Sequence, residues 1–128
     1  MAPRLLLIEP SPELRRTFTD VLERRGLEVR AASSAELAIA LCTTFSPDIL
    51  IADHDLGDAR AIGFLGELRR MYPGIVVLLT SDAFATEQKI GATTLLPKPS
   101  EPKALLGLLR RAVTADSLWH VRRGSAAG

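Results

Sequence analysis

Residues 5–16 of the chain, LLLIEPSPELRR, decide the fold because they pass directly from a buried strand to the start of a helix. The run Leu5–Ile8 is apolar throughout, which is typical of a strand buried on both faces. Ser11-Pro12-Glu13 has the features of a helix N-terminus: a serine N-cap, a proline at the first position and an acid in the first turn. Between the two lie Glu9 and Pro10. The stretch therefore predicts a β–α unit with one carboxylate at the end of its strand.

The same alternation of strand and helix continues along the chain. Further apolar runs predict strands at Leu27–Ala31, Asp48–Ala52, Ile75–Leu79 and Thr93–Leu96. The first expected helix runs from Ser11 to Gly26, with Leu14 in its apolar stripe, and the second is capped by Ser34. A third runs from about Ile62 to Met71. The last is capped by Ser100 and carries Leu105, Leu106, Leu108 and Leu109. Alternation of this kind predicts a parallel sheet with helices on both faces. The predicted core of the sheet comprises Leu6, Ile8, Ile49, Ile51, Val77 and Leu79.

Composition suits a single soluble domain. The chain has 128 residues, of which 47% are hydrophobic and 24% charged, and it contains no apolar run long enough to cross a membrane. The single cysteine, Cys42, cannot form an internal disulfide, which fits a reducing cytoplasm. It lies on a helix face beside Leu37, so we interpret it as a small buried hydrophobe.

The charge balance does not indicate a nucleic-acid partner. Formal net charge is only +1. The pairs Arg24-Arg25, Arg69-Arg70 and Arg110-Arg111 each fall near the end of an apolar-periodic segment, where cations complement the negative end of a helix dipole. We therefore expect a cytoplasmic protein that binds neither nucleic acid nor membrane.

Four polar residues follow predicted strands: Glu9, Asp53, Thr80 and Lys98. In an open parallel sheet, ligands bind at the carboxyl ends of the strands, so these side chains are expected at one edge. An aspartate carboxylate can attack phosphorus, while lysine and a hydroxyl can hold phosphoryl oxygens. Carboxylate and carbonyl oxygens suit magnesium. The alternative for any one of these residues alone is that it merely caps a strand end.

Taken in order, these pieces carry a family resemblance. They are Glu9, "SPDILIAD" ending at Asp53, "VVLLTS" with Thr80, and "GATTLLPKP" with Lys98. From Arg4 to about Val113 the chain resembles the receiver domain of two-component response regulators. The resemblance implies a flavodoxin-like, doubly wound, five-stranded parallel α/β sheet of order 2-1-3-4-5. The expected receiver domain covers residues 1–115, and the tail, 116–128, loses the pattern and is open to partial disorder.

The resemblance also implies a site. Asp53 would be the phosphoacceptor, with Thr80 and Lys98 as phosphoryl contacts and a cis bond at Lys98-Pro99. Mg²⁺ would be held by Glu9, by Asp53, and by the backbone carbonyl of Asp55, whose side chain adds a further carboxylate nearby. The implied partners are a histidine kinase or phosphotransfer protein, and a downstream protein or second copy at the face of the fourth helix, fifth strand and last helix.

Several departures mark a divergent member. Receivers usually carry two adjacent acids after the first strand, but here the second position is Pro10, which removes one metal ligand. Compensation by Glu9 or Asp55 and true loss of phosphorylation both stay open. Leu95 replaces an aromatic residue that normally couples the site to output. The segment from Thr80 to Lys98 is about one turn short, which predicts a stunted fourth helix.

Two functions are weighed. The first is a signalling domain that is phosphorylated on Asp53 and switches a partner, with no enzymatic activity beyond self-catalysed phosphoryl transfer and hydrolysis. The alternative is a pseudo-receiver, an interaction module with the same fold and no phosphorylation. A flavodoxin-like enzyme or nucleotide binder is disfavoured, because no GxGxxG or GxxxxGK[ST] loop follows the first strand. His54 is interpreted as a solvated surface residue.

Overall fold

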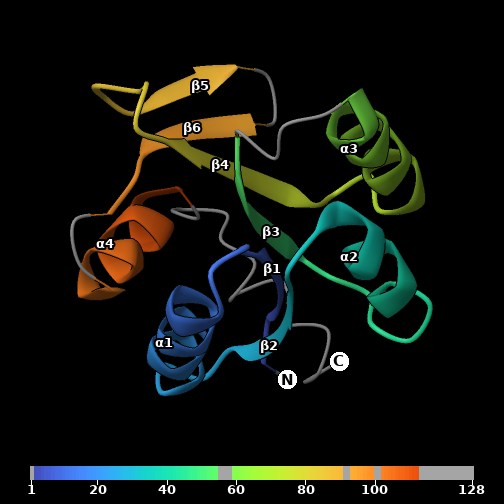
Figure 1. The fold of residues 1–128 in the computed structure, drawn as a ribbon, viewed down its shortest axis with the longest axis horizontal. Helices are drawn as coiled ribbons and strands as arrows, with labels where there is room; N and C mark the ends of the chain where they lie inside the picture. Colours follow the sequence, from blue (N-terminus) through green and yellow to red (C-terminus); the bar gives the residue numbers. More distant parts are fainter. Residues whose placement is uncertain (1, 55–58, 91–92, 100–101, 113–128) are drawn as a thin grey trace, which may run out of the picture.

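A single mixed sheet forms the centre of the part of the chain that the computed structural model describes, which is residues 2–54, 59–90, 93–99 and 102–112. Six strands in this part follow the order β2-β1-β3-β4-β6-β5 (Figure 1). They are β1 (Arg4–Ile8), β2 (Glu28–Ala32), β3 (Ile49–Asp53), β4 (Val76–Ser81), β5 (Gln88–Ile90) and β6 (Thr93–Pro97). All neighbours pair in parallel except β5 and β6, which are antiparallel. The flavodoxin-like fold expected from the sequence is confirmed, with β6 as the fifth parallel strand, but the sixth strand, the antiparallel β5, was not predicted.

Helices cover both faces of the sheet. They are α1 (Pro12–Glu23), α2 (Ala35–Leu41), α3 (Ala59–Met71) and α4 (Pro102–Ala112). Figure 1 shows α1 and α4 on one face and α2 and α3 on the other. The buried side chains accordingly divide into two clusters, one around Leu5, Leu22 and Leu105 and the other around Leu6, Leu50 and Leu68. Among the described residues, no helix is long and apolar enough to span a membrane.

Local signals in the sequence set the ends of the helices. The hydroxyl of Ser11 accepts a hydrogen bond from the backbone N–H of Leu14 at 3.3 Å, and that of Ser34 accepts one from Leu37 at 3.2 Å. Each bond satisfies one of the amide donors that a helix start leaves free. Gly26 follows α1 with a φ of +90°, in the left-handed region that glycine adopts without steric cost. The predicted caps Ser11 and Ser34 are thus confirmed, whereas the third, Ser100, lies outside the described residues.

Burial confirms the predicted sheet core and corrects one position on each of two helices, α1 and α2. All six residues predicted for the sheet core are buried, and Cys42 is buried as well. Burial raises the pKa of the Cys42 thiol, as expected for a structural cysteine. Leu14 and Leu37, in contrast, are exposed although their spacing suggested inward-facing positions. The buried part of α1 is narrower than its sequence pattern, because Phe18 and Leu22 make its core contact.

The expected fourth helix is wrong: residues 82–90 form turns and the strand β5. This strand pairs with β6, with Gln88 opposite Leu95 and Ile90 opposite Thr93. A helical crossover between parallel strands needs about a dozen residues or more. Only residues 82–92 separate β4 from β6, so a short antiparallel strand takes the place of the helix. The tail, 116–128, lies outside the described residues.

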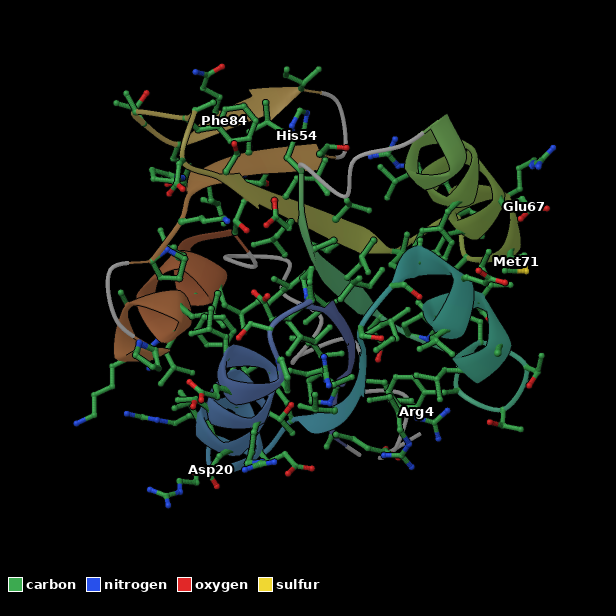
Figure 2. The ribbon with its side chains drawn as sticks, viewed as in Figure 1. Arg4, Asp20, His54, Glu67, Met71 and Phe84 are labelled. Atoms are coloured by element: carbon green, nitrogen blue, oxygen red, sulfur yellow. The ribbon has the colours of Figure 1, made fainter. Side chains whose placement is uncertain are left out.

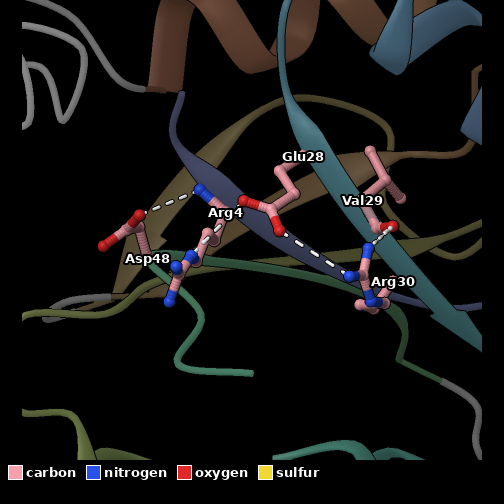
Figure 3. A network of polar contacts seen from close by, with 5 residues as sticks. All are labelled: Arg4, Glu28, Val29, Arg30 and Asp48. Atoms are coloured by element: carbon pink, nitrogen blue, oxygen red, sulfur yellow. Dashed lines mark hydrogen bonds and ion pairs between the residues drawn. The ribbon is translucent and has the colours of Figure 1, made fainter. Parts of the chain in front are cut away.

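A polar network holds the opposite edge of the sheet, where β1, β2 and β3 begin (Figure 3). The backbone N–H of Arg4 donates to Asp48 Oδ2 at 2.9 Å, and Arg4 Nε lies 3.4 Å from Glu28 Oε2. Arg30 Nη2 lies 3.7 Å from the other oxygen of Glu28. The guanidinium groups of Arg4 and Arg30 also lie over the ring of Phe45, 5.9 and 5.2 Å from its centroid. These contacts tie the three strand starts together away from the predicted site.

Truncating a fully buried side chain of β3 should destabilise the domain strongly. Leu50 is completely buried in the middle of the sheet. We expect Leu50→Ala to lower the free energy of unfolding by about 2–5 kcal/mol, because the change leaves a cavity. The matched control is Leu37→Ala, which removes the same atoms from an exposed helix position and should cost about 0.5 kcal/mol or less. Urea unfolding followed by circular dichroism measures both, and equal losses would contradict the placement of Leu50.

Candidate phosphoryl-acceptor site

The polar residues predicted from the strand ends meet at the carboxyl edge of the sheet. Asp53 is the last residue of β3 and lies opposite Thr80 of β4 in the parallel register. Thr80 lies in turn opposite Leu96 of β6, two residues before Lys98. Glu9 directly follows β1, the other neighbour of β3. The sheet order therefore places Asp53 between Glu9 on one side and Thr80 on the other.

An ion pair crosses this edge from β3 to the end of β6. Lys98 Nζ lies 3.0 Å from Asp53 Oδ2. The Asp53 side chain is only 14% exposed, whereas that of Lys98 is 40% exposed. The hydrogen bond to Asp53 raises the pKa of Lys98, and the charges of Asp53, Asp82 and Glu9 add to the rise while partial desolvation opposes it. The ammonium group is thus held in its charged form against a cluster of carboxylates.

Backbone hydrogen bonds fix the loops that follow β3 and β4. The N–H of His54, directly after Asp53, donates to the carbonyl of Thr80 at 2.8 Å. Ser81 is fully buried, and its hydroxyl accepts from the N–H of Ala83 at 3.1 Å. The N–H of Phe84 donates to the Ser81 carbonyl at 3.2 Å. Thr80 and the loop beyond it are consequently held close to Asp53.

His54 is exposed, as expected, but its ring also makes a defined contact. It meets the ring of Phe84 edge-on, with centroids 5.1 Å apart and planes inclined by 67° (Figure 2). Such edge-to-face pairs are favoured by the aromatic quadrupole. Leu95, where an aromatic residue was expected for the family, is half-buried and packs against the core beside Leu79. The residue directly after Asp53 therefore contacts an aromatic ring, that of Phe84.

Hydrogen bonds from Ser11 and Arg15 hold the loop after β1, which contains Glu9 and Pro10. The carboxylate of Glu9 accepts from the N–H of Ser11 at 2.9 Å. Arg15 Nη1 donates to the carbonyl oxygens of Glu9 and Pro10 at 2.9 and 3.4 Å. Glu9 thus serves as a local cap of its own loop as well as a neighbour of Lys98.

The carboxylates at this edge are chemically suitable ligands for magnesium, although the protein supplies only a few of them. Magnesium in phosphoryl-transfer sites is typically held by one or two carboxylates, with phosphate oxygens and waters completing its shell. Asp53 and Glu9 supply two carboxylates, although the described residues contain no group of three or more His, Cys, Asp or Glu that could hold a metal ion. Asp55, the third predicted ligand, lies outside the described residues. Pro10 offers no side-chain oxygen at the position of the missing acid.

The sequence analysis did not identify two residues that contribute to the site, Asp82 and Arg15. It also predicted the wrong isomer for one peptide bond. Asp82 follows β4 directly and adds negative charge around Lys98, a role that its position after a predicted strand could have suggested. Arg15 was overlooked because nothing in its helical position indicates that its side chain turns back to the loop. The expected cis bond at Lys98-Pro99 is wrong, since no cis peptide bond occurs among the described residues. The trans form is the lower-energy isomer even before proline.

Comparisons with known proteins agree with this geometry. The family model described as "Response regulator receiver domain" matches residues 5–110. The chain is 33% identical over 116 residues to the response regulator protein FleR of Pseudomonas aeruginosa, and 26% identical over 113 residues to the DNA-binding transcriptional regulator NtrC of Proteus hauseri. These matches cover 87% and 84% of this chain but only 24% of each relative. The chain thus spans about a quarter of the length of the relatives that it matches.

Solved structures show the same fold. The chemotaxis response regulator CheY4 of Vibrio cholerae superimposes with a TM-score of 0.69 at 22% identity, covering 88% of this chain and 99% of that one. A response regulator from Thermotoga maritima gives a TM-score of 0.71 at 17% identity, with 90% and 100% covered. The receiver domain of the hybrid histidine kinase CckA gives 0.68 at 24% identity, with 85% and 97% covered.

The pKa of Lys98 should fall when its main partner loses its charge. In Asp53→Asn the carboxylate that raises the pKa of Lys98 by hydrogen bonding and by charge is gone, so the pKa should move back toward the ordinary value. Asp82→Asn, the matched control, removes a lesser contribution and should produce a smaller downward shift. NMR titration of the lysine side-chain resonances measures both. A larger shift in Asp82→Asn would contradict the ion pair seen here.

Proposed function

The chain belongs to the response regulator receiver domains of two-component signalling, and on that basis we propose that Asp53 accepts a phosphoryl group from a histidine kinase or phosphotransfer protein and thereby switches a protein partner. The observation that carries the proposal is the 3.0 Å contact between Lys98 Nζ and Asp53 Oδ2, with Thr80 opposite Asp53 in the sheet. This arrangement joins a nucleophile, a cation and a hydroxyl at one edge. We propose a cytoplasmic location, which the single buried cysteine, Cys42, also fits.

In the proposed reaction, a carboxylate oxygen of Asp53 forms a bond to phosphorus while the bond from phosphorus to the donor's leaving group breaks. Lys98 would neutralise charge on the phosphoryl oxygens, and the Thr80 hydroxyl would donate a hydrogen bond to them. Catalysis of this kind rests on positioning and charge compensation. Magnesium, held by Asp53 and Glu9, would supply further positive charge. Water then hydrolyses the acyl phosphate, which releases inorganic phosphate and restores the Asp53 carboxylate; we propose no catalytic role beyond these two steps.

A pseudo-receiver is the second candidate, and specific observations favour it. Pro10 removes one carboxylate, while Arg15 and Ser11 already bond the loop and the Glu9 carboxylate. Leu95 offers no ring to couple the site to output. In that case the Lys98–Asp53 pair would be a permanent structural contact, and the domain would bind its partner without phosphorylation.

The partner surface proposed for either function lies around β5, β6 and α4. The predicted partner face needs correction here, because residues 82–90 form turns and β5 in place of the expected helix. The leucines of α4, the last helix, are also largely covered. Leu105 and Leu109 are buried, and Leu106 and Leu108 pack partly against the core. The large exposed hydrophobe of this face is Ile90 on the edge strand β5, which is 63% exposed. A downstream protein or a second copy would therefore meet β5. DNA binding is named for NtrC, and for this domain we propose no nucleic-acid contact.

Asp53→Asn should abolish phosphorylation. The full chain incubated with acetyl phosphate and magnesium should gain the mass of one phosphoryl group, whereas Asp53→Asn should gain none because its amide is not a nucleophile. The matched control is Asp20→Asn, an exposed position on α1, which should label like the parent. Intact mass spectrometry measures all three. Labelling of Asp53→Asn would refute the assignment, and an unlabelled parent would favour the pseudo-receiver.

Pro10→Asp should strengthen magnesium binding. The change restores a formal negative charge and an oxygen ligand for a hard cation that prefers both. We expect about a tenfold lower dissociation constant, which corresponds to roughly 1.4 kcal/mol. Pro10→Asn, the control, adds an amide oxygen without the charge and should bind more weakly than Pro10→Asp. Isothermal titration calorimetry with magnesium distinguishes them, and equal affinities of the parent and Pro10→Asp would show that other groups already fill the position.

A further inference from the structure

A groove between α1 and α4 is lined by cations that the proposed phosphoryl chemistry does not use. Its volume is about 410 Å³, and its lining comprises Val21, Arg24, Arg25, Lys103, Leu106, Gly107 and Arg110. The two helices lie side by side on one face of the sheet and contact each other (Figure 1). Figure 2 shows Asp20 near the C-terminal end of α1, next in sequence to the lining residue Val21.

The positive charge of the groove is largely uncompensated. Arg24 pairs with Asp20 at 3.1 Å, but both side chains are well exposed, so the pair is weak. Within the described part of the chain, no carboxylate forms a salt bridge with Arg25, Lys103 or Arg110. Three cations thus line one hollow whose described lining includes no acidic residue, although the chain as a whole has a net charge of only +1. Their mutual repulsion disfavours the empty groove and favours an anion within it.

The helix dipole explains only part of this charge. Arg24 caps the C-terminal end of α1, and Arg110 lies in the last turn of α4, where cations are favourable. Lys103 lies in the first turn of α4, where a cation opposes the dipole. A residue that costs stability at its own position is consistent with a binding role for the group as a whole.

The shape and lining of the groove specify the class of ligand. A volume of about 410 Å³ is in the range of small-molecule sites, which is roughly 300–1,000 Å³, and exceeds what one phosphate needs. Val21, Leu106 and Gly107 offer an apolar floor without hydrogen-bonding side chains. Guanidinium groups bind phosphate oxygens in pairs and also stack on flat rings. A ligand with several phosphates and one apolar planar ring matches both parts.

We propose that the groove between α1 and α4 binds a nucleoside polyphosphate, with Arg25, Lys103 and Arg110 holding the phosphates and the ring resting on Val21 and Leu106. The site requires no glycine-rich loop, since side-chain cations take the place of backbone amides. It is separate from Asp53 and does not depend on phosphorylation of the domain. Binding in the groove would give the receiver a second regulatory signal besides phosphorylation. The connection is α1, which lines the groove and also carries Arg15, whose side chain bonds to the loop of Glu9 and Pro10.

The test is isothermal titration calorimetry of the full chain with ATP, inorganic tripolyphosphate and adenosine at low ionic strength. ATP should bind with a dissociation constant below about 1 mM, tripolyphosphate more weakly, and adenosine weakest of all. Arg25→Glu/Arg110→Glu should weaken ATP binding at least tenfold. Arg16→Glu/Arg70→Glu, the matched control, makes the same change in net charge at exposed helix positions outside the groove and should bind like the parent. Thermal melting verifies that both double variants are folded.

Several outcomes would overturn the proposal. The first is that the parent does not bind ATP with a dissociation constant below about 1 mM. The second is that both double variants lose ATP affinity equally. The third is that Lys98→Ala loses ATP affinity while the groove variant keeps it, which would place ATP beside Asp53. Tighter binding of a short single-stranded oligonucleotide that also needs Arg25 and Arg110 would make the occupant a nucleic acid. Labelling of Asp53 by acetyl phosphate is measured separately, so the two proposals fail independently.

Discussion

The burial of β1, β3 and β4 on both faces is the constraint on which the rest of the structure depends. Strands covered by helices on each side cannot carry charge along their length without a large desolvation penalty. Charged side chains are therefore confined to the two edges where these strands start and end. Arg4 and Asp48 occupy the starting edge, and Glu9 and Asp53 occupy the carboxyl edge. The functional site is a consequence of where the sheet allows carboxylates to be placed.

At the carboxyl edge, the Lys98–Asp53 pair solves a local electrostatic problem. A carboxylate that is only 14% exposed needs a compensating charge, and the lysine at the end of β6 supplies it across β4. The 3.0 Å contact joins Lys98 to Asp53 Oδ2, and the surrounding acids keep Lys98 charged. The pair thus brings a carboxylate and a cation together at the carboxyl edge of the sheet. This pair is compatible with both proposed functions, the phosphorylated receiver and the pseudo-receiver. The presence of Asp53 therefore does not distinguish the two functions, whereas Pro10, which lacks a carboxylate, favours the pseudo-receiver.

Most of the fold could be predicted from the sequence because its signals are local. Apolar runs marked the central strands, Ser11 and Ser34 marked helix starts, and strand ends marked Asp53, Thr80 and Lys98. The strand β5 could not be predicted in the same way, since it depends on pairing with β6 and on a crossover too short for a helix. The turn of Arg15 toward Pro10 and the charge of Asp82 on Lys98 likewise depend on tertiary placement. Periodicity identified helix faces without showing how wide the buried stripe of α1 would be.

The absence of an aromatic residue at position 95 does not leave the site without a route to the partner surface. The N–H of His54 is bonded to the carbonyl of Thr80, so the backbone after Asp53 is fixed to β4. The His54 ring contacts Phe84, whose own N–H is bonded to Ser81 at the end of β4. Phe84 belongs to the segment that leads into β5, the exposed edge of the sheet. A change in the position of Thr80 would therefore disturb contacts that continue to β5 by packing and hydrogen bonds, without rotation of a ring at Leu95. Coupling through contiguous contacts of this kind requires only that the loop have two arrangements of similar energy.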